Sequence, residues 1–149
     1  MIGAKLRNFT LVLLSFCMIL SADTEFAEPK PAMDNPRKII FSINSADDAA
    51  IHHVLSSANN VLKFYGVENV EMKIVAYYHG IKTLEKKYKD IALRVRALML
   101  LDVEFIACGN TLRTKKIQED ELVEGSEIVT AGIVEMIERV KEGWVYIVP

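Results

Sequence analysis

The chain has very little cysteine, with only Cys17 and Cys108 among its 149 residues. A disulfide framework is therefore excluded, and the fold must rest on a hydrophobic core. The composition suits such a core, because 51% of the residues are apolar and 26% are charged. These proportions indicate one globular domain and exclude disorder of the chain as a whole.

Positive charge, metal ligands and phosphate-binding motifs are also scarce. The 18 Lys and Arg residues are outnumbered by 20 Asp and Glu residues, which argues against a nucleic acid partner. Of the three histidines, His52 and His53 are adjacent and would point about 100° apart on a helix. We therefore expect no metal site within one chain, while ligands shared between subunits stay open. The sequence has neither a Gly-rich phosphate loop with a lysine nor a Gly-x-Ser-x-Gly elbow, so we expect no cofactor.

The longest uncharged stretch of the chain lies near the N-terminus. Residues 9–20 follow two basic residues and precede small ones, which is typical of a secretory signal peptide over residues 1–22. These 12 residues are fewer than the about 20 that a membrane-spanning helix needs. We therefore expect cleavage after Ala22, no stable membrane insertion, and a periplasmic or secreted mature protein with Cys108 as its single cysteine. A retained N-terminal anchor is the alternative.

Periodicity divides the rest of the chain into a linker and one domain. Residues 23–36 hold three of the four prolines and predict an extended linker, which leaves the domain over residues 37–149. Strands are expected over residues 38–43, 70–78, 103–107, 126–130 and 144–148. Helices are expected over residues 49–65, 91–101 and 111–117, and in a last helix with a core face of Ile133, Val134, Ile137 and Val140. This alternation predicts an α/β fold with a mainly parallel sheet covered on both faces.

Cys108 stands where the third strand is expected to end and a helix to begin. Ligands of open α/β sheets bind at the carboxyl edge of the strands, and the amides at a helix N-terminus stabilise a thiolate. His79 follows the second strand, so it is expected at the same edge of the sheet. The competing interpretations are a buried cysteine that acts only as a small apolar residue, and a histidine that only hydrogen-bonds the backbone.

Several short segments, in their order and spacing, carry a resemblance to a known family. They are Asn59-Asn60, Val75-Ala76 before His79-Gly80, Ala107-Cys108-Gly109-Asn110-Thr111-Leu112, Ala131-Gly132-Ile133-Val134-Glu135, and Glu142-Gly143-Trp144-Val145-Tyr146-Ile147. The set resembles the DsrE/DsrF-like family, in its branch with a Cys-Gly-Asn-Thr motif. The resemblance covers residues 38–149, and the ordered set is specific where any one segment would be weak.

The resemblance implies a three-layer α/β/α sandwich with five parallel strands in the order 4-3-2-1-5, assembled as a homo-trimer or hexamer. In this order the second and third strands are neighbours, so His79 and Cys108 would emerge side by side as candidate catalytic residues. The candidate binding residues around them are Gly80, Gly109, Asn110, Thr111 and Gly132. Better characterised members of the family act in sulfur relay, in which a cysteine receives a sulfane sulfur as a persulfide and passes it to a partner protein.

These observations predict an exported protein that carries sulfane sulfur or exchanges thiols at Cys108, in a sulfurtransferase-like role with a sulfur donor or acceptor protein. The alternative is a non-catalytic oligomeric module that binds a small molecule or a protein at the same place. A third interpretation is a redox sensor that forms an intermolecular disulfide through Cys108. For the binding residues the plainer interpretation is structural, since Asn110 and Thr111 can cap a helix and the glycines can permit turns.

Overall fold

The computed structural model describes residues 24–149. The expected signal peptide, with Cys17, lies outside these residues. Within them the chain forms five strands, which are β1 (Arg37–Ile43), β2 (Val70–Ala76), β3 (Val103–Cys108), β4 (Glu127–Val129) and β5 (Val145–Ile147). The α-helices of this part are α1 (Asp48–Tyr65), α2 (Lys89–Met99), α3 (Gly109–Lys115) and α4 (Gly132–Lys141). Three 3-10 helices complete it, namely η1 (Val67–Asn69), η2 (Tyr78–Leu84) and η3 (Glu119–Glu121).

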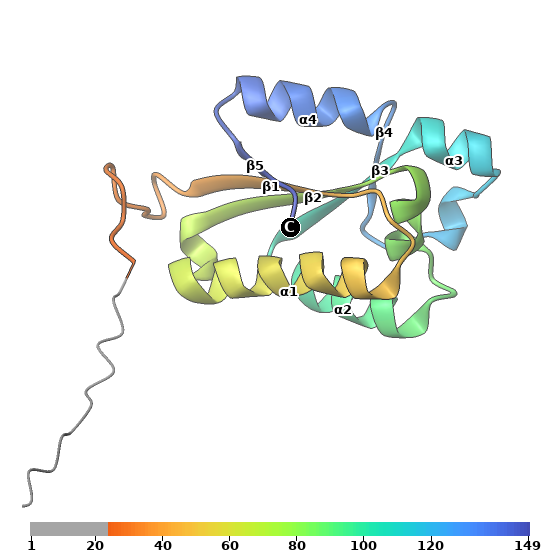
Figure 1. The fold of residues 1–149 in the computed structure, drawn as a ribbon, viewed down its shortest axis with the longest axis horizontal. Helices are drawn as coiled ribbons and strands as arrows, with labels where there is room; N and C mark the ends of the chain where they lie inside the picture. The colour runs from red at the N-terminus through yellow and green to blue at the C-terminus, as the bar shows by residue number, and fades with distance from the viewer. Residues whose placement is uncertain (1–23) are drawn as a thin grey trace, which may run out of the picture.

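The five strands form one sheet in the order β4-β3-β2-β1-β5, and every neighbouring pair is parallel. Helices α1 and α2 lie on one face of the sheet and α4 lies on the other (Figure 1). This confirms the three-layer sandwich and the strand order that the resemblance implies. Because Ala76 of β2 pairs with Ala107 of β3, these two strands end next to each other.

The larger core lies between the sheet and the pair α1 and α2. Asp47 caps the N-terminus of helix α1, because its side chain accepts a hydrogen bond from the Ala50 amide at 2.9 Å. Gly66, with a φ of 85°, is the C-terminal cap. This positive φ favours glycine. The apolar face of α1 is fully directed to the sheet, and its buried residues are Ile51, Val54, Leu55, Ala58 and Leu62. Burial of each of the larger side chains, those of Ile, Val and Leu, stabilises the fold by roughly 1.5–3 kcal/mol.

Helix α4 is placed differently from what its periodicity predicted. Its buried residues are Gly132 and Met136, whereas the four expected core residues are 46–53% exposed. These four are Ile133, Val134, Ile137 and Val140. The prediction of their burial was therefore wrong. The reason is that the core on this side is small, since only Ile40, Val75, Ile106, Met136 and Trp144 form it. Periodicity identifies an apolar stripe on a helix, but it does not identify what covers the stripe.

The chain turns sharply after β2. The strand was expected to reach residue 78, but it ends at Ala76. The Tyr77 amide makes the last ladder hydrogen bond, to the Ile43 carbonyl of β1, and the backbone leaves the extended conformation at Tyr78, whose φ is 51°. The 3-10 helix η2 follows and passes close beneath that carbonyl. A Cβ atom at Gly80 would lie only 2.0 Å from the Ile43 oxygen, so this position requires glycine.

The segment before β1 packs against the domain. Arg37 donates hydrogen bonds to the carbonyl oxygens of Pro29 and Ala27, and the Phe26 ring packs on those of Phe64 and Tyr65 with centroids 5.5 Å away. Residues 24–36 are thus held near the C-terminal end of α1. Between residues 24 and 149, no helix is both long and apolar enough to cross a membrane.

Candidate functional site

Cys108 is the last residue of β3 and the residue directly before α3. Its place at the carboxyl edge of the sheet follows from the register, because Cys108 pairs with Val129 at the end of β4. It is the free cysteine of the described chain and is 6% exposed. The sulfur therefore lies just below the surface, at the edge where open α/β sheets bind ligands.

The sulfur of Cys108 is surrounded by hydrogen-bond donors. The donors are the Gly132 amide, the Thr111 hydroxyl and the Thr111 amide, while the nearby Asn110 amide, which donates to the Thr130 carbonyl at 3.1 Å, adds a smaller effect. Burial of the sulfur favours the neutral thiol and raises the pKa, but the donors stabilise the thiolate and together lower the pKa of Cys108 below that of an ordinary cysteine. The arrangement thus favours the thiolate, which is the nucleophilic form of cysteine.

The Thr111 hydroxyl is oriented by its own hydrogen bond. Its oxygen accepts a hydrogen bond from the Tyr78 backbone amide at 3.0 Å. Since this amide occupies a lone pair of the oxygen, the hydroxyl hydrogen is free to point at the sulfur of Cys108. Thr111 therefore connects the end of β2 with the thiol, a role beyond the helix cap that its sequence position suggests.

Two glycines let the neighbouring backbone approach Cys108. A Cβ atom at Gly132 would lie 3.2 Å from the Cys108 Cβ and 2.9 Å from Val75 Cγ1. A Cβ atom at Gly109 would lie 2.9 Å from the Val129 carbonyl oxygen. The absence of a side chain at Gly132 brings the first amide of α4 to the sulfur, so this glycine serves close packing, whereas the sequence suggested only a turn.

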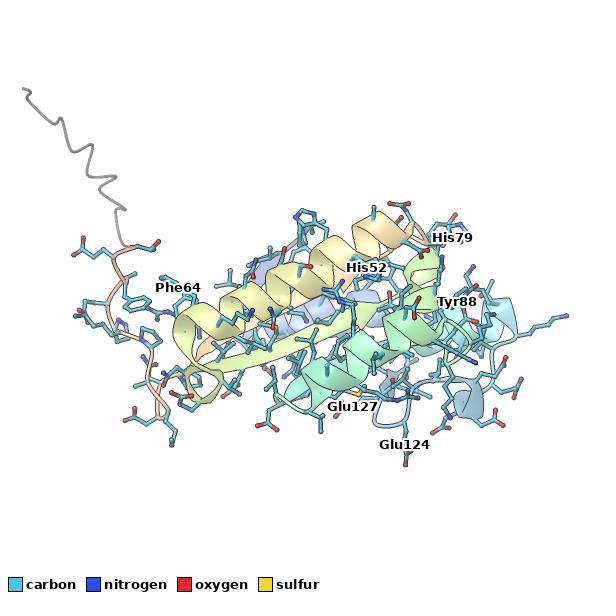
Figure 2. All side chains as sticks on the ribbon, turned by 90° about the horizontal axis from the view of Figure 1, so that it is seen from below. His52, Phe64, His79, Tyr88, Glu124 and Glu127 are labelled. Atoms are coloured by element: carbon cyan, nitrogen blue, oxygen red, sulfur yellow. The ribbon has the colours of Figure 1, made fainter. Side chains whose placement is uncertain are left out.

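His79 lies in η2, at the end of the molecule opposite Phe64 (Figure 2). Its ring stacks on Tyr78 with centroids 3.9 Å apart, and its Nδ1 lies 3.2 Å from Lys115 Nζ. No hydrogen bond joins His79 to Cys108 in the part of the chain that the structure describes. The two residues share an edge of the sheet, but the donors around the sulfur come from α3 and α4.

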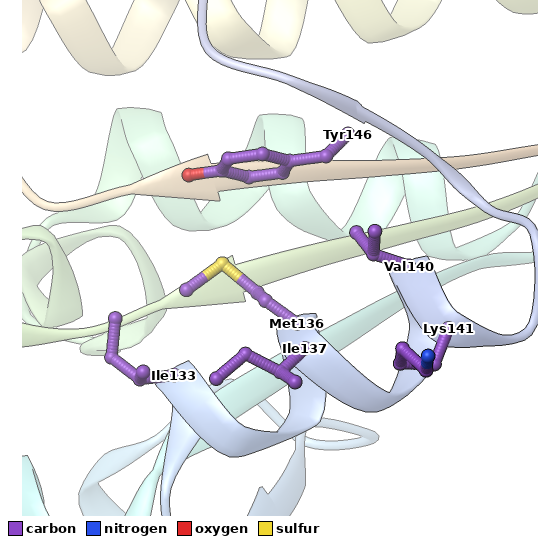
Figure 3. Close-up of a pocket in the computed structure, with 6 residues that line it drawn as sticks. All are labelled: Ile133, Met136, Ile137, Val140, Lys141 and Tyr146. Atoms are coloured by element: carbon purple, nitrogen blue, oxygen red, sulfur yellow. The ribbon is translucent and has the colours of Figure 1, made fainter.

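A groove runs between α4 and β5, on the same side of the sheet as the thiol. We call it the α4–β5 groove; it measures about 300 Å³ and its side chains are shown in Figure 3. It is lined by Ile133, Met136, Ile137, Val140, Lys141 and Tyr146. Five of these six residues are apolar or aromatic, so the groove offers an almost purely apolar surface.

The described residues contain no group of three or more His, Cys, Asp or Glu side chains that could hold a metal ion. The chemistry that the site offers through Cys108 is that of a thiolate and its donors. Two residues at this site, Tyr78 and Lys115, could not be found by searching the sequence for motifs. Tyr78 acts through its backbone amide, and Lys115 lies at the far end of α3 from the Cys-Gly-Asn-Thr motif.

A comparison with models of known protein families shows which family this chain belongs to. The sequence model of the DsrE/DsrF-like family matches residues 37–149. The chain belongs to the DsrE/DsrF-like family. This family is associated with sulfur relay.

Two solved structures share the DsrE-like fold with this family member. The protein of unknown function MTH1491 from Methanobacterium thermoautotrophicum is 30% identical, with 76% of this chain and 99% of that chain covered and a TM-score of 0.72. The ychN protein from E. coli is 17% identical, with 74% and 96% covered and a TM-score of 0.63, which shows a likeness of fold alone. No curated protein sequence matches the chain.

Proposed function

We propose that this DsrE-like protein carries sulfane sulfur as a persulfide on Cys108 and passes it to a partner. The observation that carries the proposal is the set of donors from the beginnings of α3 and α4 that lower the pKa of a nearly buried thiol. A cysteine with only a packing role has no need of such donors. Association of the family with sulfur relay supports the same function.

The reaction is a pair of exchanges at sulfur. The Cys108 thiolate attacks the outer sulfur of a donor persulfide, a new S–S bond forms, and the donor thiolate leaves with the electron pair of the broken bond. An acceptor thiolate then attacks the outer sulfur on Cys108 and restores the Cys108 thiolate. No net oxidation occurs, so one cysteine is sufficient. The partners in this scheme are a sulfur donor and an acceptor protein.

The proposal is tested by loading the protein with inorganic hydropolysulfide and measuring its intact mass. The wild type is expected to gain the mass of one sulfur atom, which a reductant removes and which Cys108→Ser does not gain. Equal gain by the wild type and Cys108→Ser would contradict the proposal. Hydropolysulfide is chosen as the donor because it is small and Cys108 is only 6% exposed.

The same low exposure favours one competing function, a binding module in which Cys108 never reacts. The two functions differ in the reactivity of the thiol toward iodoacetamide. A carrier alkylates with a pH midpoint below that of free cysteine, whereas a binding module with an inert thiol alkylates slowly and with a midpoint at or above it. Burial also opposes a redox sensor, because an intermolecular disulfide requires the sulfur atoms of two chains to meet.

Assembly into a homo-trimer or hexamer is part of the proposal. Its support is the α4–β5 groove, in which Ile133, Ile137, Val140 and Tyr146 are 43–53% exposed. Contiguous apolar surface of this kind marks interaction sites on soluble proteins. A second copy of the chain packed on the groove would cover these side chains.

We also propose that the protein acts outside the cytoplasm, on the strength of the signal-like residues 1–22. N-terminal sequencing of the protein recovered from the periplasm or the medium is expected to begin after Ala22. Recovery of the full-length chain from the cytoplasm alone would contradict this location.

A further inference from the structure

A second pocket, with polar side chains in its wall, lies beside the thiol. It measures about 230 Å³ and is lined by Tyr78, Asn110, Thr111, Thr114 and Lys115. Thr111 lines this pocket and also donates its hydroxyl hydrogen bond to the Cys108 sulfur. The pocket and the thiol therefore share one side chain as a wall, and a small molecule in the pocket lies next to the nucleophile.

The pocket carries a cation without an anionic partner. Lys115 Nζ contacts His79 Nδ1 at 3.2 Å and lies 5.9 Å from the centre of the Tyr78 ring. Within residues 24–149, no carboxylate lies within ion-pair distance of Lys115. An ammonium group has three donors, and the contact with the imidazole nitrogen uses one. Lys115 thus has two donors left for a ligand.

A second basic side chain strengthens the positive potential at this place. Arg113, on the same helix, donates to the side-chain oxygen of Asn110, which also lines the pocket. It too lacks a carboxylate partner in the described part of the chain. Since the whole chain has a net charge of −2, this is a local concentration of positive charge beside the nucleophile.

We propose that the pocket binds a small oxyanion that carries a sulfane sulfur, of which thiosulfate is the simplest example. This inference rests on the proposed sulfur-carrier function and names its donor class. The oxyanion end would lie on Lys115, with the sulfane sulfur toward Cys108. A small donor fits better than a protein persulfide, because the sulfur of Cys108 lies below the surface behind Thr111.

The chemical step balances without another reactant. The Cys108 thiolate attacks the outer sulfur of thiosulfate and forms a new S–S bond. The S–S bond of thiosulfate breaks, and sulfite leaves with its electron pair. The products are a Cys108 persulfide and sulfite. Lys115 would stabilise the negative charge that collects on the leaving sulfite.

Thiosulfate binding is measured by calorimetry on the full-length Cys108→Ser variant, in which no transfer occurs. Adding Lys115→Met is expected to weaken binding by about tenfold or more, since a charge-assisted hydrogen bond is lost. The matched control is Lys63→Met, which removes an equally exposed lysine from the last turn of α1. No thiosulfate binding, or equal weakening by the two substitutions, would overturn the proposal.

Sulfur loading of the wild type separates this inference from the proposed function. If thiosulfate binds and depends on Lys115, but no donor loads Cys108, the pocket is supported and the carrier function fails. If hydropolysulfide or a protein persulfide loads Cys108 while thiosulfate neither binds nor loads, the carrier function is supported and the anion pocket is overturned.

Discussion

The backbone amide of Gly132, the first residue of α4, donates a hydrogen bond to the sulfur of Cys108, the last residue of β3. The contact joins the catalytic candidate to the helix whose other side forms the α4–β5 groove. The close approach favours glycine, because a Cβ atom at this position would lie 2.9 Å from Val75 Cγ1 and 3.2 Å from the Cys108 Cβ, so that these neighbours would have to shift. Helix α4 therefore contributes both a group beside the thiol and part of the exposed apolar surface.

Gly132→Ala is expected to destabilise the fold by about 1–3 kcal/mol, because the new methyl group would lie 2.9 Å from Val75 Cγ1. Chemical denaturation measures this loss. Gly80→Ala provides the comparison and is expected to cost more, since its Cβ would meet the Ile43 carbonyl at 2.0 Å. If Gly132→Ala were as stable as the wild type, the close approach of α4 to Cys108 would be contradicted.

Thr111→Val is expected to raise the pKa of Cys108, because the thiolate loses the hydroxyl donor while burial still favours the neutral thiol. The pH midpoint of iodoacetamide alkylation should then move up by about one pH unit, so that the rate at neutral pH falls. Thr111→Ser should retain the wild-type midpoint. Thr114→Val is the matched control, since the Thr114 hydroxyl donates to the Asn110 carbonyl and not to the sulfur. A wild-type midpoint for Thr111→Val would remove Thr111 from the account.

Ile137→Glu is expected to reduce the oligomer to smaller species, because a carboxylate would be placed in the α4–β5 groove and would have to be desolvated on assembly. Sedimentation velocity measures the change. Leu93→Glu is the control, as Leu93 is an exposed leucine on α2, on the opposite face of the sheet. An assembly unaffected by Ile137→Glu would show that this groove is not the subunit interface.

Arg94→Ala is expected to lower the free energy of unfolding by roughly 1–3 kcal/mol. The Arg94 guanidinium on α2 bridges to α1, where it contacts His52 Nδ1 at 2.6 Å and Ser56 Oγ at 2.9 Å. Arg96→Ala on the same helix is the control, since Arg96 is exposed, and it should change stability by about 0.5 kcal/mol or less. Equal effects of the two substitutions would mean that the bridge between the helices adds no stability.

The fold was largely predictable from the sequence. The apolar face of α1 is a continuous row between Asp47 and Gly66, and both end residues act as caps, as their residue types indicate. The prediction erred where local pattern and tertiary contact disagree. Strand β2 stops at Ala76 because the backbone leaves the extended conformation at Tyr78, where η2 begins, although the residue types continue the pattern of a strand.

The site was predictable only in part. The position of Cys108 at the end of β3 follows from the apolar run before it and the helix start after it. The contact between His79 and Lys115 does not follow from either residue's own segment, since it depends on how η2 and α3 pack. The exposure of the apolar face of α4 could not be predicted either, because periodicity shows an apolar stripe on a helix but not whether another part of the protein covers it.

A sulfur carrier requires a Cys108 thiolate that reacts with sulfane sulfur, and the direct measurement is the rate of persulfide formation on Cys108 as a function of pH. With hydropolysulfide as donor and intact mass as readout, we predict one added sulfur atom, no addition to Cys108→Ser, and a midpoint below that of free cysteine. Absence of loading at every pH, or equal loading of Cys108→Ser, would contradict the account.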